Sequence, residues 1–326
     1  MKVIADGRWL GNTGIGRVYK EVIKRKPDHV NLDVIEGDFP LGHPGGPLFL
    51  SRQIIKSDAE IFYSPSFMPP LSSSIPFVIT IHDLNHLYYY SLFHKIYLKY
   101  VIRNLADKAK KIITVSEFTK DEIVNKLTIK AEKIEVIYNG IDESFHQNRE
   151  SLVLERPYFL YIGNRRSYKN INRMLKAFAV ASISRDYLLA FSGEPDDLLR
   201  KEIEMLNISN RIKFFGNIDD RDLPSIYKGA TALLFVSLME GFGLPVLEAM
   251  ASGTPVITSN ITSLPEIAGS AAILVNPNDI KDISIAIERI VTDTALRSSL
   301  INLGFAQAKN FSWDKAAKQT WDIILK

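Results

Sequence analysis

The chain has 326 residues, of which 46% are apolar and 24% charged, and its formal net charge is +3. This length predicts two domains of about 150 residues each, and the composition is that of compact globular proteins rather than disordered or fibrous ones. The sequence has no cysteine, which excludes disulfides, thiolate nucleophiles and cysteine-bound metals. The small net charge gives no reason to expect a nucleic-acid partner. Because no apolar run reaches the roughly 20 residues that span a bilayer and the start has no secretory pattern, we expect a cytoplasmic protein.

Short apolar runs typical of buried strands alternate with longer amphipathic stretches. In chain order the runs are MKVIAD (1–6), FVITIHD (77–83), KKIITVSE (110–117), PYFLYIGN (157–164), DYLLAFSG (186–193), RIKFFGN (211–217), ATALLFVS (230–237), TPVITSN (254–260) and AAILVNP (271–277). This alternation predicts βαβ units and parallel sheets. A loosely patterned stretch at 144–157 interrupts it and predicts a domain boundary near residue 150. We therefore expect an α/β protein with two Rossmann-like, doubly wound parallel-sheet domains whose strand ends face a central cleft.

The segment LMEGFGLPVLEAM (238–250) places two carboxylates around a glycine-containing turn. The two glycines permit positive φ and close backbone approach, and Pro245 suits the first turn of a helix. Unpaired N–H groups at a helix start favour phosphate, and a carboxylate can accept two hydrogen bonds from the vicinal hydroxyls of a sugar. The pattern indicates a sugar-nucleotide site, with Glu240 and Glu248 as the carboxylates. The alternative is that Glu248 only complements the helix dipole and Glu240 is solvated.

Three other segments carry polar groups at the ends of expected strands. YIGNRRSYKN (161–170) places three cations between a strand and a helix, where they can neutralise a diphosphate or form a solvated basic loop. His82 ends the run FVITI and could position a sugar hydroxyl or be a core histidine bonded to a backbone carbonyl. TGIG (13–16) opens a helix expected near Arg17, but it lacks the third glycine of a dinucleotide fingerprint.

These segments together resemble the family four glycosyltransferases, a retaining group with the GT-B fold. The stretch EGFGLPVLE (240–248) resembles the family's E-x7-E element. The other segments that match in order are TGIGRV (13–18), ITIHDL (79–84), VSEFTKDEI (115–123), VIYNGID (136–142), YIGNRRSYKN (161–170) and GTPVITSNITSLPEIAG (253–269). Together they cover nearly the whole chain, which is short for the family.

The resemblance implies an organisation of the two domains. Residues 1–150 would form the acceptor-side domain, residues 151–310 the nucleotide-sugar donor domain, and residues 311–326 a helix that crosses back to the first domain. The implied reaction is the transfer of a hexosyl group to a glycan or lipid-linked glycan in the synthesis of a cell-surface polysaccharide such as O-antigen. The first choice for the transferred group is mannosyl, with GDP-mannose as the donor. The transfer would retain anomeric configuration and use no metal or other cofactor. The same fold also hosts sugar-nucleotide 2-epimerases, and a non-catalytic nucleotide-sugar binding protein is a further alternative.

The resemblance also implies roles for single residues. Glu240, Lys169, Arg165 and His82 would be catalytic. The donor-binding residues would be Gly14, Gly16, Gly163, Gly241, Phe242, Gly243, Leu244 and Glu248. The family often carries Arg directly after the strand-end glycine, whereas this chain has Asn164 there. We infer that Arg165 takes the role of that arginine.

Two remaining patterns need an interpretation. Asp220-Arg221-Asp222 has the spacing of a metal-binding D-x-D, but it stands before an expected helix, where Asp is a common capping residue, so we expect no metal there. Residues 88–111 are rich in aromatic and basic side chains. Such a segment either contacts an anionic membrane, which would place the protein on the inner face of the membrane, or buries its aromatic side chains in the N-terminal core.

Overall fold

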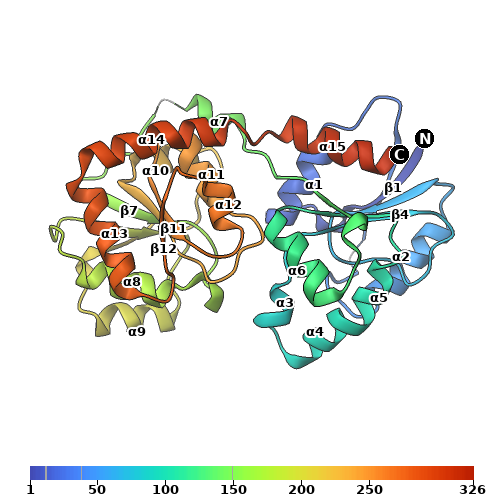
Figure 1. Ribbon diagram of the computed structural model, residues 1–326, viewed down its shortest axis with the longest axis horizontal. Coiled ribbons are helices and arrows are strands. Elements are labelled where there is room, and N and C mark those ends of the chain that lie inside the picture. Colours follow the sequence, from blue (N-terminus) through green and yellow to red (C-terminus); the bar gives the residue numbers. More distant parts are fainter. Residues whose placement is uncertain (12, 38, 149) are drawn as a thin grey trace. The chain divides into compact units, whose positions relative to one another are not determined.

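The computed structural model describes residues 1–11, 13–37, 39–148 and 150–326, and the chain divides into two compact units (Figure 1). The N-terminal unit comprises Met1–Gly140 and Ser312–Lys326, and the C-terminal unit comprises Ile141–Phe311. The division after Gly140 precedes the expected boundary at residue 150. The physical reason is that Phe145 packs its ring against Tyr227 of the C-terminal unit, with 5.9 Å between the centroids.

The N-terminal unit contains, in its described residues, one parallel sheet of six strands in the order β2-β1-β3-β4-β5-β6. Its strands are β1 (Lys2–Asp6), β2 (Asn31–Ile35), β3 (Ile61–Ser64), β4 (Phe77–Ile81), β5 (Lys111–Thr114) and β6 (Ile134–Val136). Its α-helices are α1 (Gly14–Lys24), α2 (Gly46–Ile55), α3 (Asn85–Tyr88), α4 (Leu92–Ile96), α5 (Arg103–Ala106), α6 (Glu117–Leu127) and α15 (Trp313–Leu325), and the other turns are η1 (Gly7–Trp9), the π-helical η2 (Tyr97–Ile102) and η3 (Ala131–Lys133).

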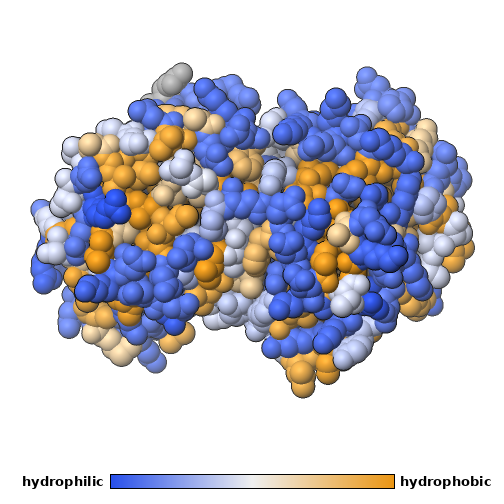
Figure 2. Space-filling model, in the orientation of Figure 1, coloured by the Kyte–Doolittle hydropathy of each residue, from blue (hydrophilic) through white to orange (hydrophobic). Residues whose placement is uncertain are grey.

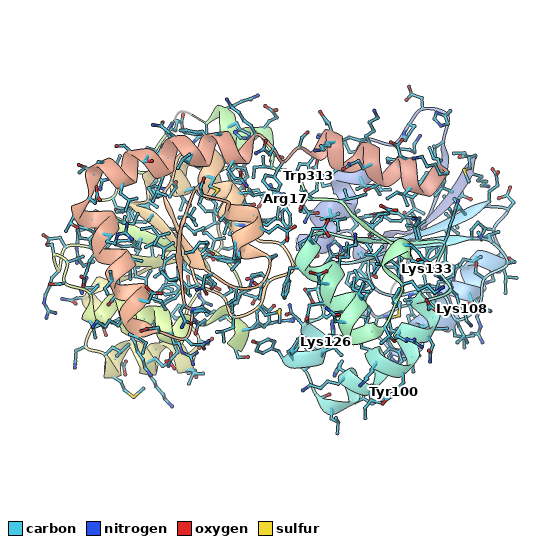
Figure 3. All side chains as sticks on the ribbon, in the orientation of Figure 1. Arg17, Tyr100, Lys108, Lys126, Lys133 and Trp313 are labelled. Atoms are coloured by element: carbon cyan, nitrogen blue, oxygen red, sulfur yellow. The ribbon has the colours of Figure 1, made fainter. Side chains whose placement is uncertain are left out.

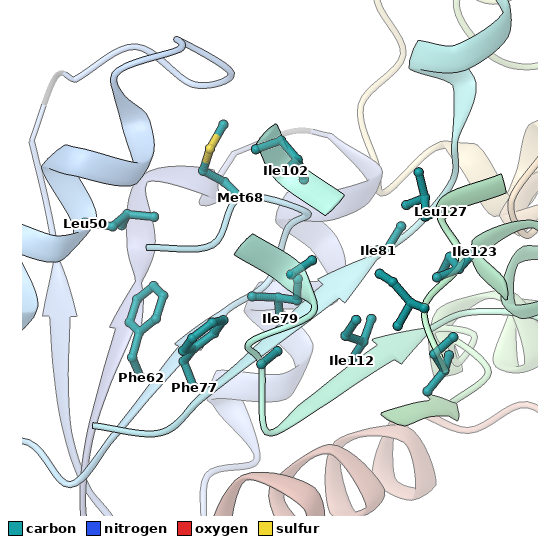
Figure 4. Close-up of a cluster of buried hydrophobic side chains, with 14 of the residues drawn as sticks. Leu50, Phe62, Met68, Phe77, Ile79, Ile81, Ile102, Ile112, Ile123 and Leu127 are labelled. Carbon is teal, nitrogen blue, oxygen red and sulfur yellow. The ribbon is translucent and has the colours of Figure 1, made fainter. Parts of the chain in front are cut away.

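One apolar core lies between this sheet and the helices that cover it. Phe62, Phe77, Ile79 and Ile112 project from neighbouring strands, and Ile102 of η2 packs over them (Figure 4). Strands β3 and β4 are buried along their whole length. A parallel strand that is covered on both faces needs apolar side chains on both, and most residues of these two strands are apolar.

The last helix, α15, packs on α1 of the same unit. The indole Nε1 of the buried Trp321 donates a hydrogen bond of 2.9 Å to the carbonyl of Val22, and Arg25 forms an ion pair of 2.5 Å with Asp314. The apolar face of α15 therefore completes the core of the unit in which the sequence begins.

The C-terminal unit has a second parallel sheet of six strands in its described residues, in the order β12-β11-β10-β7-β8-β9. Its strands are β7 (Tyr158–Tyr161), β8 (Leu188–Phe191), β9 (Ile212–Phe214), β10 (Ala232–Phe235), β11 (Val256–Ser259) and β12 (Ile273–Val275). Its α-helices are α7 (Glu143–Gln147), α8 (Ile171–Val180), α9 (Asp197–Met205), α10 (Leu223–Gly229), α11 (Leu244–Ala251), α12 (Leu264–Ala268), α13 (Ile280–Thr292) and α14 (Thr294–Ala308), with short turns η4 (Ser167–Lys169) and η5 (Ser209–Arg211).

The two sheets confirm the predicted fold class of two Rossmann-like, doubly wound units. Every apolar run identified in the sequence contains a strand, whereas β2, β3 and β6 were not predicted. Among the described residues, no helix combines the length and hydropathy that a membrane span requires.

Candidate functional site

The C-terminal sheet has its topological switch point between β7 and β10. These strands are neighbours, and because both are parallel their carboxyl ends open at the same edge of the sheet. In open α/β sheets ligands bind outside the carboxyl ends of the strands at such a point. The loops that leave this edge, residues 162–170 and 236–243, carry most of the predicted site residues.

A buried ion pair joins the two loops. Lys169 Nζ lies 2.6 Å from Glu240 Oε1, and the two side chains are only 11% and 12% exposed. The ammonium also lies 5.1 Å from the ring centroid of Phe235, at the end of β10. Low exposure strengthens the attraction between the charges and fixes both side chains. The structure thus brings together the two residues on which the predicted chemistry depends most.

Asn170 anchors this arrangement from the next position in the chain. It is buried with a left-handed φ of +61°, and its amide Nδ2 donates to the carbonyls of Val236 at 2.9 Å and Pro277 at 2.8 Å. The N–H of Leu238 donates to the carbonyl of Tyr168 at 2.7 Å. These bonds tie the loop after β7 to the loops after β10 and β12, and hold Lys169 beside Glu240. The sequence analysis gave Asn170 no role. Asn is a common N-cap residue, but here its side chain does not cap α8 and joins the loops instead.

Ser263 binds the backbone of the glycine-containing turn through its hydroxyl. Its buried hydroxyl lies 2.9 Å from the carbonyl of Glu240 and 2.8 Å from that of Phe242. One hydroxyl therefore fixes the backbone on both sides of Gly241. The sequence analysis included Ser263 in the segment 253–269 without assigning it a role.

The turn leads into α11 through a glycine that cannot be replaced without strain. Gly243 has φ +123°, and a Cβ there would lie 2.9 Å from Leu264 Cδ2. The N-cap residue Gly243 has no side chain that could cap the helix, whose first turn begins at Leu244 and contains Pro245. Phe242 turns its ring inward onto Phe311, at 6.0 Å between centroids. The ring of Phe242, a predicted donor-binding residue, is therefore packed inside the C-terminal unit.

Glu248 lies within α11 and is buried. Its Oε2 accepts a hydrogen bond of 2.8 Å from the hydroxyl of Tyr227, which is itself buried in α10. Glu248 is thus held in a fixed orientation by a neighbouring helix, and it is not a solvated carboxylate at the helix start. The sequence analysis did not identify Tyr227.

Gly163 and Arg165 face the neighbouring strand β8. Gly163 has φ +142°, and its N–H donates to Ser192 Oγ at 3.1 Å. The guanidinium of Arg165 donates to the carbonyls of Glu194 at 2.5 Å and Ser192 at 2.8 Å. The structure therefore directs Arg165 towards the loop after β8, and does not bring it to the Lys169–Glu240 pair.

In the N-terminal unit, Gly14 and Gly16 lie in the first turn of α1, which begins at Gly14 rather than near Arg17 as expected. The N–H of Gly16 donates to Thr13 Oγ1 at 3.0 Å, so the capping side chain already uses the donor predicted for a ligand. A Cβ at Gly16 would lie 2.2 Å from the carbonyl oxygen of Gly11, whereas one at Gly14 would meet nothing within 4 Å. Close packing is the reason for glycine at position 16.

His82 follows β4 and donates through Nε2 to the carbonyl of Pro65 at 2.8 Å. A carbonyl can only accept, so Nε2 carries the proton and Nδ1 is an acceptor. Burial lowers the pKa of His82, which favours the neutral form of the ring. The backbone bond matches the core-histidine alternative, while the Nδ1 lone pair is compatible with a bond to a sugar hydroxyl.

A second buried ion pair, which the sequence analysis missed, follows β1. Arg8 Nε lies 2.7 Å from Asp6 Oδ1 and Arg8 Nη2 lies 2.7 Å from Asp6 Oδ2, a bidentate geometry. The guanidinium carbon is 4.7 Å from the ring centroid of Phe49. The pair fixes η1, against whose backbone Gly16 packs.

The acidic D-x-D segment does not cap α10 through a side chain as expected. Asp222 stands at the N-cap position of α10, but its side chain makes no capping hydrogen bond. Arg221 instead pairs with Asp219 at 2.9 Å. Within the described residues, no cluster of three or more His, Asp or Glu could hold a metal ion.

Two family models together match most of the chain. The model described as glycosyl transferases group 1 matches residues 142–307, and the model described as glycosyltransferase family 4 matches residues 16–145. The first contains Lys169, Glu240 and Glu248, and the second contains Gly16 and His82.

Two similar curated proteins are bacterial mannosyltransferases. The O-antigen chain mannosyltransferase B of Escherichia coli is 32% identical over 80% of this chain and 72% of that protein. The O-antigen chain mannosyltransferase RfbU of Salmonella typhimurium is 35% identical over 65% of this chain and 60% of that protein.

Solved structures share the fold at low sequence identity. HepE of Anabaena, solved in complex with UDP and glucose, has a TM-score of 0.80 at 17% identity and covers 99% of this chain and 98% of its own. WaaG, a glycosyltransferase involved in lipopolysaccharide biosynthesis, has a TM-score of 0.78 at 15% identity and covers 99% of both chains.

Proposed function

The chain belongs to the family four glycosyltransferases and has the GT-B fold, and we propose that it transfers a mannosyl group from a nucleoside diphosphate sugar to a glycan or lipid-linked glycan. The observation that carries the proposal is the Lys169–Glu240 pair beside the uncapped start of α11. The choice of mannose is supported by the two O-antigen mannosyltransferases, which align with most of this chain. GDP-mannose is the donor that we would test first.

The proposed donor site uses the C-terminal unit. Lys169 and the N–H groups at the start of α11 would bind the diphosphate, because a cation and a helix N-terminus both favour anions. Glu240 would accept hydrogen bonds from the transferred sugar. Glu248, oriented by Tyr227, would bind the ribose hydroxyls. Arg165 would act on the donor only if its guanidinium turned away from the carbonyls of Ser192 and Glu194.

The same groups suit the departure of the diphosphate. Cleavage of the glycosidic bond leaves negative charge on the β-phosphate, and preorganised positive groups at this position stabilise the transition state. We propose that transfer retains anomeric configuration, with the leaving phosphate accepting the acceptor's proton. The proposed reaction needs no divalent metal because Lys169 and α11 supply the positive charge. His82 would position a sugar hydroxyl through its Nδ1.

The proposed acceptor is a growing surface polysaccharide, in keeping with the names of the similar mannosyltransferases. A lipid-linked acceptor would lie at the cytoplasmic face of the membrane. We therefore also propose that the enzyme contacts that membrane.

Thermal stabilisation by nucleoside diphosphates tests the donor site. GDP, UDP, dTDP and ADP are each added with and without EDTA; a ligand at 100 times its dissociation constant adds about 2.7 kcal/mol to the free energy of unfolding. We expect GDP to stabilise the protein selectively and EDTA to leave the shift unchanged. Absence of a shift with every nucleotide would contradict the donor-site assignment.

Transfer assays then test the reaction. GDP-mannose, with a glycan acceptor, should yield the mannosylated product and GDP, and Glu240→Gln should lower kcat by a factor of about 100 or more. Lys176→Ala, at an exposed position of α8, is the control and should retain activity. Conversion of the donor without an acceptor to a 2-epimer would favour the epimerase, and binding without any turnover would favour a non-catalytic role.

A further inference from the structure

One helical segment of the N-terminal unit has apolar residues on two opposite faces. α4, η2 and α5 run without a break from Leu92 to Ala106. The inner face is formed by Leu98, Ile102 and Leu105, all of which are buried, and Figure 4 shows Ile102 over the sheet. This inner face already satisfies the packing requirement of the segment. The alternative of a core helix thus accounts for the inner face and leaves the apolar residues of the outer face unexplained.

The outer face is exposed. Leu92 is 70% exposed, Phe93 58%, Ile96 49% and Tyr100 60%. Their spacing of one, three and four residues places them along one side of the helix. Figure 2 shows hydrophobic residues at the lower end of this unit, where Figure 1 places α4. Scattered surface apolar residues are normal, but a contiguous row of large ones marks an interaction surface.

Two lysines, Lys95 and Lys99, lie in the same helical segment as this row, and Lys108 and Lys110 follow the segment in the chain. Among the described residues, no carboxylate lies within 4.0 Å of the amino group of Lys95, Lys99, Lys108 or Lys110. The carboxylate of Asp107, directly after α5, lies 3.7 Å from the amino group of Lys133. Figure 3 shows Tyr100 near the lower edge of the unit and Lys108, which follows α5, higher and to the right. The surface therefore combines exposed apolar groups with uncompensated positive charge.

We infer that the row Leu92–Phe93–Ile96–Tyr100 is the membrane-docking surface, and that it inserts between anionic lipid headgroups, with the neighbouring lysines binding the phosphates. Amphipathic helices of this composition bind at the interface through buried apolar area and attraction to anionic lipid. A second copy of the chain fits this surface less well, since pairing two copies would bring their lysines together. The inference deepens the proposed membrane contact, and only its link to a lipid-linked acceptor rests on the proposed function.

Vesicle sedimentation tests the inference without any measurement of transfer. The full chain is mixed at low salt with vesicles of phosphatidylglycerol and phosphatidylcholine, or of phosphatidylcholine alone. We expect binding to the anionic vesicles that is at least about tenfold stronger than to the neutral ones and that weakens as salt is added. No binding of the wild-type chain to anionic vesicles at low salt would overturn the inference.

Matched variants locate the surface. Phe93→Ser with Ile96→Ser should reduce vesicle binding at least about tenfold, because the apolar area that enters the lipid is lost. The control is Leu198→Ser with Met205→Ser, which removes side chains that are 71% and 73% exposed on α9 of the C-terminal unit. Equal loss in both double variants, or no loss in the first, would overturn the assignment of this surface.

Charge variants and a spectroscopic probe complete the test. Lys95→Glu with Lys99→Glu should abolish the preference for anionic vesicles, whereas Lys176→Glu with Lys201→Glu should retain it. Phe93→Trp should show emission quenched by brominated acyl chains beyond the wild-type background. If the wild-type chain, without lipid, forms dimers that Phe93→Ser with Ile96→Ser abolishes, the surface joins two copies and the inference is wrong.

Discussion

At the scale of single residues, the Lys169–Glu240 pair makes a prediction for stability as well as for activity. Replacing Lys169 with Met leaves the Glu240 carboxylate in a site that is only about one tenth exposed, without its cation. We expect the free energy of unfolding to fall by about 3 kcal/mol, measured by denaturant titration.

The double variant Lys169→Met with Glu240→Gln tests the cause of that loss. Removing both charges should recover part of the stability, since no uncompensated charge remains. Lys130→Met, at an exposed position paired with Glu132, is the control and should change stability by less than about 0.5 kcal/mol. A double variant less stable than Lys169→Met would show that the pair is not the source of the effect.

The hydroxyl of Tyr227 predicts a separate effect on nucleotide binding. Tyr227→Phe removes the bond to Glu248, which we expect to cost about 2 kcal/mol of stability and to weaken nucleoside diphosphate binding. Tyr158→Phe is the matched control, because its buried hydroxyl bonds a backbone carbonyl, that of Ile226, at 2.6 Å. It should lower stability while leaving the nucleotide dissociation constant unchanged. Equal binding by all three proteins, measured by calorimetry, would remove Glu248 from the site.

His82 gives the stability a pH dependence of known sign. Burial lowers the pKa of His82 in the folded protein, so below the unfolded value of about 6.5 the unfolded chain binds a proton that the folded chain does not. The free energy of unfolding should therefore decrease as the pH falls from about 7 to about 5. In His82→Gln, which keeps a donor for the Pro65 carbonyl, the decrease should be smaller. Parallel curves for the two proteins would contradict this assignment.

At the scale of elements, the two glycines of α1 differ in what they contribute. Gly16→Ala forces a Cβ against the backbone of Gly11, and should destabilise the protein by about 1–3 kcal/mol as η1 shifts. Gly14→Ala meets no neighbour and, in the first turn of the helix, should be neutral or stabilising by up to about 1 kcal/mol. Thermal melting of both variants measures the difference. Similar losses at both positions would contradict the packing explanation.

The elements also show where sequence patterns suffice. Strands β7, β8 and β10 are buried along their whole length, so their apolar runs stand out in the sequence. Strand β2 lies at one edge of its sheet and has a single buried residue, Ile35, and β6 lies at the other edge and has three residues. Strands β2 and β6 bury too few side chains to produce a distinct apolar run, which is why they were missed. This reason does not apply to β3, which is buried along its whole length and was overlooked.

At the scale of the whole molecule, the two units have separate cores, and α15 belongs to the first although it ends the sequence. Trp321→Ala removes a fully buried side chain and its hydrogen bond to Val22. We expect the N-terminal unit to lose about 3–5 kcal/mol, seen by calorimetry as a lower melting temperature for one of two transitions. Phe178→Leu, in the core of the C-terminal unit, should lower the other transition. A uniform shift of both transitions by each variant would show that the units unfold together.

The sequence by itself determined the fold class, the family and the identity of the residues at the strand ends. These follow from local patterns, namely apolar runs with the period of strands and turns with glycine or proline at fixed spacing. Only the tertiary structure decided which of those residues meet. Lys169 and Glu240 are neighbours because β7 lies beside β10, an order that hydrogen bonding between distant segments sets. The same holds for Asn170, Ser263 and Tyr227, whose partners are distant in the sequence and are brought within bonding distance only by folding.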